Sequence, residues 1–391
     1  MRLGIDASNL RAGGGVTHLV QLLQEAEPRE QGFDEVVVWG NAATLAKLQP
    51  RDWLHKSHQP LLDRSLPFRQ YWQRFMLDRL AVQQDCQVLF IPGGSYGGSF
   101  QPYVAMSQNM LPFEWKEARR YGVSWMTLRL MLLTRLQTRT FRRASALVFL
   151  TDYARTEISR VADGLPSAYA VVPHGIDKPF FMPPREQRDM SGYSPRNPFR
   201  VLYVSIVDVY KHQWHVAEAA ATLRKAGIPI QLDLVGPAYA PAGKRLNAVL
   251  QRVDPASEFI RVLGPLPYHE LPTRYQQADA FVFASSCENL PNILLEAMAA
   301  GLPIACSNRG PMPEVLCDCG QYFDPESPSE IAEALRTLVE SPSLRAEQAA
   351  AAFKRAQQYS WKRCADQTLS LLAQQVNPRP SVSNSELSLV S

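Results

Sequence analysis

The sequence lacks the features that predict a membrane-spanning, secreted or nucleic-acid-binding protein. No stretch of its 391 residues approaches about 18 consecutive apolar residues, so no transmembrane helix is predicted. The opening segment MRLGIDASNL reads as a strand and lacks the long apolar region of a signal peptide. The formal net charge of +4 is too mild to favour nucleic acid as a partner. We therefore expect a cytoplasmic protein.

Cysteine is scarce and is not arranged as a metal site. The six cysteines include no C-x-x-C pair, and most lie in or beside apolar runs, as free thiols in a reducing compartment do. Cys317 and Cys319 stand one residue apart, but two ligands without a His cluster do not predict a bound metal. The sequence therefore predicts no metal site.

The chain contains two sets of alternating strand-like and helix-like segments. It is long for one domain and natural for two, and its hydrophobic fraction of 46% is enough for two cores. Short apolar runs separated by helical patterns imply a parallel sheet with helices on both faces. Strands are predicted at residues 3–5, 36–39, 88–91, 103–106 and 146–150, then at 201–206, 230–235, 259–263, 280–284, 303–306 and 321–323. Helices are predicted at 16–26, 125–143, 214–226 and 269–277 and within 329–373.

We expect an α/β protein with two doubly wound, Rossmann-like domains that face each other across a cleft. The first domain covers residues 1–178, a linker rich in Pro, Arg and Ser covers 179–198, and the second domain covers 199–358. The tail, residues 376–391, is predicted to be disordered. Ligands of such sheets bind in the crevice at the carboxyl ends of the strands.

The most informative segment is SSCENLPNILLEAMAAG, residues 285–301. It places Glu288 in a loop after a buried strand and Glu296, eight positions later, inside a helix. Pro291 suits the first position of that helix, and Gly301 ends it. A lone carboxylate among so many apolar residues is costly unless it has a partner or faces a wet cleft. The helix start beside it is a natural site for a diphosphate.

These residues resemble a known family. The pattern E-x7-E followed by AMAAGLPI is similar to that of the retaining nucleotide-sugar glycosyltransferases of family 4, which have the GT-B architecture. The resemblance extends to about Ala373 and is more specific in the second domain. It implies that Glu288 contacts the donor sugar and Glu296 the ribose of the nucleotide. It also implies that residues 359–375 form a helix that crosses back onto the first domain.

The resemblance assigns the donor diphosphate to both sides of the cleft. The turn Asn289-Leu290-Pro291 and the helix after it would hold one side, and the glycine-rich loop with Gly14 and Gly15 the other. Lys211 fits a family lysine that stabilises the departing diphosphate, so we expect Lys211 and Glu288 to be the catalytic residues. The family's accompanying Arg is missing, because Ser205 and Ile206 occupy the expected places. Nothing in the sequence identifies a substitute.

The acceptor side is predicted in the turn after residues 103–106. There Gln108 and Asn109 take a place where the family often has a His, near the transferred sugar. Both can hydrogen-bond hydroxyl groups, but neither acts as a base at neutral pH. This fits a retaining front-face reaction, in which the leaving phosphate takes the acceptor proton. The chain also lacks a D-x-D motif, which agrees with a metal-independent reaction without a cofactor.

Two further residues resemble family positions and are expected to be structural. His174 precedes a glycine in the turn VVPHGID, where a left-handed turn is expected. Glu314 stands near a helix start, where the simplest interpretation is a cap favoured by the dipole of its own helix.

Residues 125–143 form a basic amphipathic helix, and two interpretations of it stay open. Arg64, Arg69, Arg74 and Arg79 recur upstream in an aromatic-rich segment. The simpler interpretation is a helix that buries its Leu face and solvates its basic face. The more specific interpretation is that the helix binds the anionic inner face of the plasma membrane, where the enzyme would reach a lipid-linked acceptor.

The sequence thus predicts an enzyme that moves a hexose-type sugar from a nucleoside diphosphate sugar to an acceptor hydroxyl. The expected acceptor is a glycan or a lipid-linked molecule, and the expected setting is bacterial surface polysaccharide or lipopolysaccharide assembly, by analogy with the family alone. A GT-B epimerase or phosphorylase and a non-catalytic sugar-nucleotide-binding subunit are the alternatives. The absent Arg favours the subunit.

Overall fold

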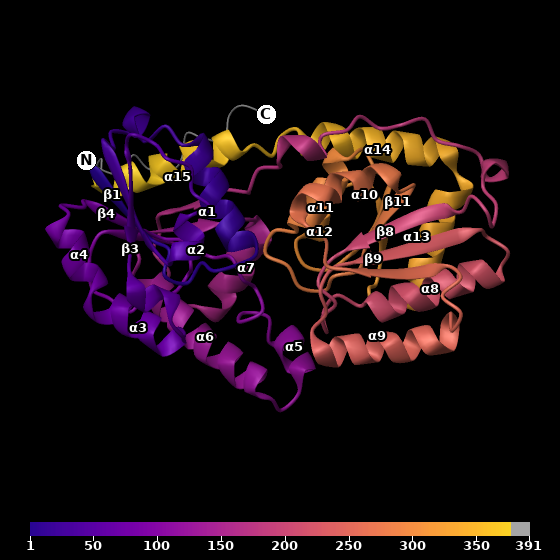
Figure 1. The fold of residues 1–391 in the computed structure, drawn as a ribbon, viewed down its shortest axis with the longest axis horizontal. Helices are drawn as coiled ribbons and strands as arrows, with labels where there is room; N and C mark the ends of the chain where they lie inside the picture. Colours follow the sequence, from indigo (N-terminus) through magenta and orange to yellow (C-terminus); the bar gives the residue numbers. More distant parts are fainter. Residues whose placement is uncertain (377–391) are drawn as a thin grey trace.

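The computed structural model describes residues 1–376 and contains two α/β domains joined side by side (Figure 1). The first domain has a seven-stranded sheet in the order β3-β2-β1-β4-β5-β6-β7, and the second a six-stranded sheet in the order β10-β9-β8-β11-β12-β13. All strand pairs within both sheets are parallel. The prediction of two doubly wound domains is confirmed. The predicted disordered tail lies outside the described residues, except for Val376, which ends a helix.

The strands of the first sheet form where apolar residues are buried on both faces. The five predicted strands of this sheet are present, whereas β3 and β7 were not predicted. Both are edge strands with exposed side chains, so they lack an apolar run. The strands are β1 (Arg2–Asp6), β2 (Glu35–Gly40), β3 (Leu54–His58), β4 (Val88–Ile91), β5 (Tyr103–Met106), β6 (Ala146–Phe149) and β7 (Tyr169–Val171).

The helices of the first domain cover both faces of its sheet. The predicted basic helix is present as α6, and Ser124 caps it by accepting a hydrogen bond from the Thr127 N–H. The helices are α1 (Gly14–Glu25), α2 (Ala42–Leu45), α3 (Leu66–Phe75), α4 (Leu77–Gln83), α5 (Trp115–Ala118), α6 (Trp125–Arg143) and α7 (Asp152–Val161). Short 3₁₀ helices include η2 (Pro60–Asp63) and η3 (Arg119–Tyr121).

All six strands predicted for the second domain are present in its sheet. Its strands are β8 (Phe199–Val204), β9 (Ile230–Val235), β10 (Ile260–Gly264), β11 (Ala280–Phe283), β12 (Ile304–Ser307) and β13 (Gln321–Phe323). The helices are α8 (Gln213–Lys225), α9 (Ala240–Val253), α10 (Leu271–Gln277), α11 (Asn292–Ala299), α12 (Met312–Leu316), α13 (Pro328–Glu340) and α14 (Pro342–Ala356). Helix α9 was not predicted, because Pro241 and Gly243 near its start obscure the helical pattern.

The chain crosses between the domains twice. The first crossing, residues 178–198, contains two 3₁₀ helices, η4 (Lys178–Phe180) and η5 (Met190–Gly192). The buried Arg345 of α14 anchors this crossing, because its guanidinium donates to the Arg188 carbonyl and to Gln187 Oε1, the latter at 3.0 Å. The second crossing leads into α15 (Trp361–Val376), which packs on α1 and on strands of the first sheet (Figure 1). The exact domain boundaries stay a prediction.

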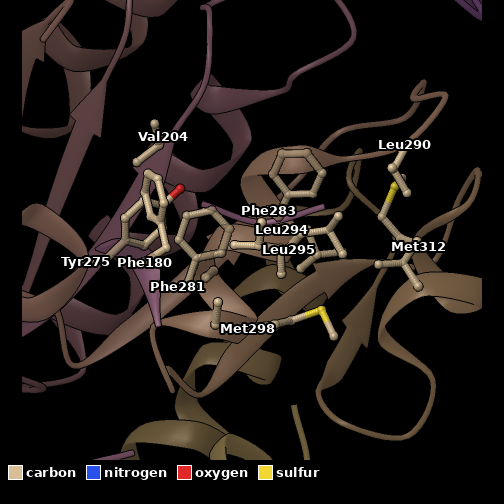
Figure 2. Close-up of a cluster of buried hydrophobic side chains, with 14 of the residues drawn as sticks. Phe180, Val204, Tyr275, Phe281, Phe283, Leu290, Leu294, Leu295, Met298 and Met312 are labelled. Carbon is tan, nitrogen blue, oxygen red and sulfur yellow. The ribbon is translucent and has the colours of Figure 1, made fainter. Parts of the chain in front are cut away.

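Helix α11 is the most deeply buried helix near the domain boundary. Its side chains Leu294, Leu295 and Met298 pack on Phe281 and Phe283 of the adjoining sheet region (Figure 2). This apolar packing fixes the direction in which the start of α11 points. No helix among residues 1–376 has the length and hydropathy to cross a bilayer.

Candidate active site

A cleft of about 410 Å³ lies between the domains, at the carboxyl ends of strands from both sheets. The loops after β1 and β7 form one wall. The loops after β8, β9, β10 and β11 form the other. The side chains and backbone that line the cleft include Gly13, Gly14, Thr17, Gly175, Ser205, Ile206, Gly236, Tyr268, Phe283, Glu288, Leu290, Pro291, Asn292, Glu296 and Trp361.

Glu288 faces this cleft and is paired with Lys211. The Lys211 ammonium donates a hydrogen bond to Glu288 Oε1 and lies over the rings of Tyr210 and Phe283, 5.1 and 5.3 Å from their centroids. Lys211 is only 5% exposed, since it stands behind Glu288 rather than in the cleft wall. The two predicted catalytic residues are therefore in direct contact, and their charges offset each other before any ligand binds.

Glu296 faces the same cleft from inside α11. Its carboxylate accepts hydrogen bonds from Tyr275 Oη at 3.0 Å and from Tyr268 Oη at 3.4 Å. No cation pairs with it among the described residues, and burial raises the pKa of this carboxyl to about 8. The predicted need for partners is met by two phenols, and with this pKa the Glu296 carboxyl is mostly protonated at neutral pH.

The three residues before α11 point in different directions. Leu290 and Pro291 line the cleft, and the helix begins at Asn292, one residue later than the position expected for Pro291. Asn289 turns toward the first domain, because its Nδ2 donates to Ser107 Oγ at 3.1 Å and its carbonyl accepts from Thr151 Oγ1 at 3.0 Å. Asn289 therefore bridges the domains beside the cleft.

The glycine-rich loop brings a second helix start to the cleft. Gly13 has a φ of 70° and precedes α1, which begins at Gly14. A Cβ on Gly14 would lie 3.7 Å from Asn292 Nδ2, so the starts of α1 and α11 meet across the cleft. Two helix N-termini that converge on one space favour an anion between them.

The predicted acceptor-side residues separate in the structure. Gln108 is half-buried behind Gly15, where a Cβ would stand 2.9 Å from Gln108 Oε1, so a glycine is needed for this close approach. Gln108 Nε2 lies 3.4 Å from His18 Nδ1. Asn109 is exposed, and its Oδ1 accepts a hydrogen bond from the Leu111 N–H at 3.1 Å, which is a turn contact. Neither amide belongs to the cleft lining.

A stack of buried rings supports the floor of the cleft. His174 lies between His18 and Trp361, at centroid distances of 4.8 and 5.3 Å, and its Nδ1 is 3.1 Å from Asn292 Oδ1. Burial lowers the pKa of His174 to about 4 and that of His18 well below its usual value, so both are neutral. His174 therefore connects the turn VVPHGID to the start of α11. No local sequence pattern predicts this stack, because His174 is 156 positions from His18 and 187 positions from Trp361.

The described cleft lining holds no Lys, Arg or His side chain. Ser205 and Ile206 form the wall where the resemblance places an arginine. Among residues 1–376, no group of three His, Cys, Asp or Glu side chains could hold a metal ion.

Glu314 lies in the first turn of α12, yet its side chain caps a helix of the other domain. Its two carboxylate oxygens accept hydrogen bonds from the Asp152 and Tyr153 N–H groups at 2.9 and 2.8 Å, at the start of α7. The expectation that Glu314 caps its own helix was wrong, because the unpaired amides of α7 are a better partner. Arg120 makes a second bridge, with its guanidinium 2.7 and 3.0 Å from the Glu326 oxygens.

Comparisons with known proteins agree with this geometry. Residues 185–355 match the family model of the group 1 glycosyl transferases. The O-antigen chain mannosyltransferase B of Escherichia coli is 36% identical over 112 residues, which is 29% of each chain. The chain spans between 29% and 58% of the length of the curated relatives that it matches.

Solved structures match the whole fold. The Anabaena protein HepE in complex with UDP and glucose has a TM-score of 0.65 at 18% identity, over 95% of this chain and 98% of that one. WaaG, a glycosyltransferase involved in lipopolysaccharide biosynthesis, has a TM-score of 0.68 at 14% identity, over 95% and 99%. At this identity the likeness shows the fold, which is GT-B. The chain therefore has the GT-B fold, and residues 185–355 match the group 1 glycosyl transferases.

Proposed function

We propose that this protein is a retaining, metal-independent glycosyltransferase. It transfers a hexose-type sugar from a nucleoside diphosphate sugar to an acceptor hydroxyl on a glycan or a lipid-linked molecule. The proposed setting is bacterial surface polysaccharide or lipopolysaccharide assembly, which the relatedness to an O-antigen mannosyltransferase supports.

One observation carries the proposal: two carboxylates and two helix starts share a single cleft. Glu288 and Glu296 both line it, and so do Gly14 and Asn292 at the starts of α1 and α11. Carboxylates accept hydrogen bonds from sugar hydroxyls, whereas helix starts favour the negative charge of a diphosphate. A nucleoside diphosphate sugar is a ligand that uses both kinds of group at once.

Each charged residue of the site has a separate role in the proposed reaction. Glu288 holds hydroxyls of the transferred sugar, and Glu296, with Tyr268 and Tyr275, holds the ribose. Lys211 stands behind Glu288, so its ammonium can bond the diphosphate while it keeps its contact with the carboxylate. As the bond to the sugar breaks, negative charge grows on the leaving oxygen, and Lys211 together with the helix starts stabilises it. The departing phosphate oxygen then accepts the proton of the acceptor hydroxyl.

A donor panel tests the proposal. The protein is incubated with UDP-, GDP- and dTDP-sugars and candidate acceptors, and the release of nucleoside diphosphate is measured. Product anomers are compared with the donor by nuclear magnetic resonance, and activity is measured with and without EDTA. Acceptor-dependent release with retention, unchanged by EDTA, is the expected result. Inversion or dependence on a divalent cation would contradict the mechanism.

The binding-subunit alternative is favoured by one observation, the absence of a cation from the described cleft lining at Ser205 and Ile206. Tight binding of a sugar nucleotide without release under any acceptor would support it. Conversion of the free donor sugar to its epimer would instead support an epimerase.

A further inference from the structure

Three arginines gather at the carboxyl edge of the first sheet, outside the donor cleft. We refer to Arg11, Arg69 and Arg129 as the arginine triad. Arg11 follows β1, Arg69 belongs to α3 and Arg129 to α6, and these two helices run along the same side of the first domain (Figure 1). The sequence pattern of the basic helix included Arg129, but it did not indicate that Arg11 and Arg69 would join it.

The protein backbone holds two members of the triad in place. Arg69 Nη1 donates to the Ser8 carbonyl at 3.3 Å, directly after β1. The Arg11 guanidinium donates to the Arg64 and Asp63 carbonyls at 2.9 and 3.2 Å. Arg129 makes no hydrogen bond or ion pair with the described residues and is exposed on α6. Carbonyl partners orient a guanidinium without neutralising its charge.

No ion pair with the described residues neutralises the triad. Within residues 1–376, no carboxylate lies within 4.0 Å of any of the three guanidinium groups. Arg11 contributes to the lowered pKa of the Asp63 carboxyl without forming an ion pair with it. The Asp63 carboxylate instead accepts a hydrogen bond from the Ala42 N–H at 2.9 Å and contacts His58. Burial and repulsion by Arg11 and Arg129 lower the pKa of Arg69, and its Nε is buried without a partner. The repulsion that Arg69 experiences from Arg11 and Arg129 would be relieved by a bound anion.

The triad belongs to the first domain, on which the sequence predicts the acceptor side. Arg11 is three positions before Gly14, which lines the donor cleft, and Arg69 contacts the loop after β1. Arginine offers a planar fork of donors that matches phosphate oxygens, and phosphate carries enough charge to offset several guanidinium groups. We propose that the arginine triad binds the phosphate group of a phosphorylated acceptor; that this phosphate belongs to an acceptor rests on the proposed function.

The phosphate has two sources with the same chemistry, a lipid headgroup and a water-soluble phosphate ester. Large apolar side chains are exposed on the same two helices, including Phe68 and Tyr71 on α3 and Leu128 and Leu132 on α6. Such side chains would lie against lipid chains, whereas a soluble ester would use the arginines alone. The experiment below separates the sources with a matched pair of probes.

The soluble probe is glycerol 3-phosphate, titrated by calorimetry into the full chain. A saturating nucleoside diphosphate from the donor panel is present, so that the phosphate cannot enter the donor site. Arg129→Gln is the main variant, because its side chain has no protein partner to lose. Arg139→Gln is the control, since it removes the same charge from an exposed position on the same helix. Arg129→Gln should weaken binding about tenfold, as expected for one charge-assisted hydrogen bond, and Arg139→Gln less than twofold.

The lipid probe is phosphatidic acid in phosphatidylcholine vesicles, which presents the same phosphate with acyl chains, and binding is measured by flotation. Loss of vesicle binding in Arg129→Gln but not in Arg139→Gln assigns the phosphate to a lipid. The same selectivity with glycerol 3-phosphate alone assigns it to a soluble ester. Equal effects of both substitutions, or no binding of either probe, would overturn the proposal. If the donor panel identifies no nucleotide, the titration runs without one, and a selective effect of Arg129→Gln over Arg139→Gln still tests the triad, because neither residue lines the donor cleft.

Discussion

At the scale of single residues, Glu296 shows how the burial of one carboxyl links the stability of the fold to pH. It is 7% exposed and has two phenol partners instead of a cation. Burial raises its pKa from 4.5 to about 8, so the folded protein retains a proton that the unfolded chain releases. The stability contributed by this proton is present below about pH 4.5 and is lost as the pH rises through about 8.

Glu296→Gln should remove this pH dependence. Between pH 5 and 8, the free energy of unfolding of the wild type should fall relative to the variant by at most about 1.4 kcal/mol per pH unit, because the unfolded state binds fewer protons there. Above about pH 8 the difference should level off. Urea unfolding of both proteins at pH 5, 6.5, 8 and 9 measures it. A difference that does not change with pH would show that the carboxyl is ionised throughout.

The ribose role of Glu296 is tested by a different substitution. Glu296→Ala should weaken donor binding by about tenfold or more, because it removes a buried acceptor and leaves Tyr268 and Tyr275 without their partner. Calorimetric titration of the nucleoside diphosphate measures the dissociation constant. Donor binding equal to that of the wild type would remove Glu296 from the ribose site.

Lys211→Ala should act mainly on turnover. In the proposed mechanism Lys211 stabilises charge that develops only as the diphosphate leaves, so kcat should fall about 10²–10³-fold with a smaller change in donor affinity. Lys225→Ala, at the end of α8, is a control for loss of one positive charge. A purely structural role for Lys211 would instead lower the melting temperature and leave the turnover of the remaining folded protein unchanged.

At the scale of elements, Gly175 determines how closely α15 approaches the first domain. A Cβ at this position would lie 2.1 Å from the Trp361 backbone nitrogen, which no side chain can accommodate without displacing the helix. Gly175→Ala should lower the free energy of unfolding by about 1–3 kcal/mol. Gly192→Ala, where the nearest neighbour would be 3.5 Å away, is the control. Urea unfolding of both variants provides the comparison, and equal stabilities would contradict tight packing at Gly175.

The elements that the sequence predicted best are those whose pattern is local. Central strands such as β4 and β11 are short apolar runs buried on both faces, and α6 has a capping serine and a long amphipathic pattern. Edge strand β3, with the sequence LHKSH, has no such run. The spacing of Glu288 and Glu296 located the cleft because both lie on one strand–turn–helix unit. The pairing of Lys211 with Glu288 could not be read from periodicity, since 77 positions separate them.

At the scale of the whole molecule, a few polar contacts join the domains across the cleft. Glu314 caps α7 of the first domain, and Arg120 of the first domain binds Glu326 of the second. These contacts are far apart in the sequence, which is why the sequence placed Glu314 at its own helix. They hold the two walls of the cleft close together, which excludes water from a bound donor.

Removing both contacts should open the cleft. Glu314→Ala combined with Arg120→Met should increase the radius of gyration in small-angle scattering and raise donor hydrolysis without acceptor. The loss of the capping contact alone should cost about 0.5–2 kcal/mol of interdomain attraction. Glu333→Ala with Arg336→Met is the matched control, because this ion pair lies within α13. If the two double variants gave the same scattering curve, contacts other than Glu314 and Arg120 would hold the two domains together.

The return of α15 to the first domain has a consequence for the order of synthesis. The first sheet and α1 are made well before α15, the helix that covers them. At about 5–20 residues per second, nearly 200 intervening residues take on the order of 10–40 s to translate. During that time the early half exposes the apolar surface that α15 later buries. We therefore expect a nascent chain of this protein to need a chaperone over its amino-terminal half until α15 has been made and has packed on it.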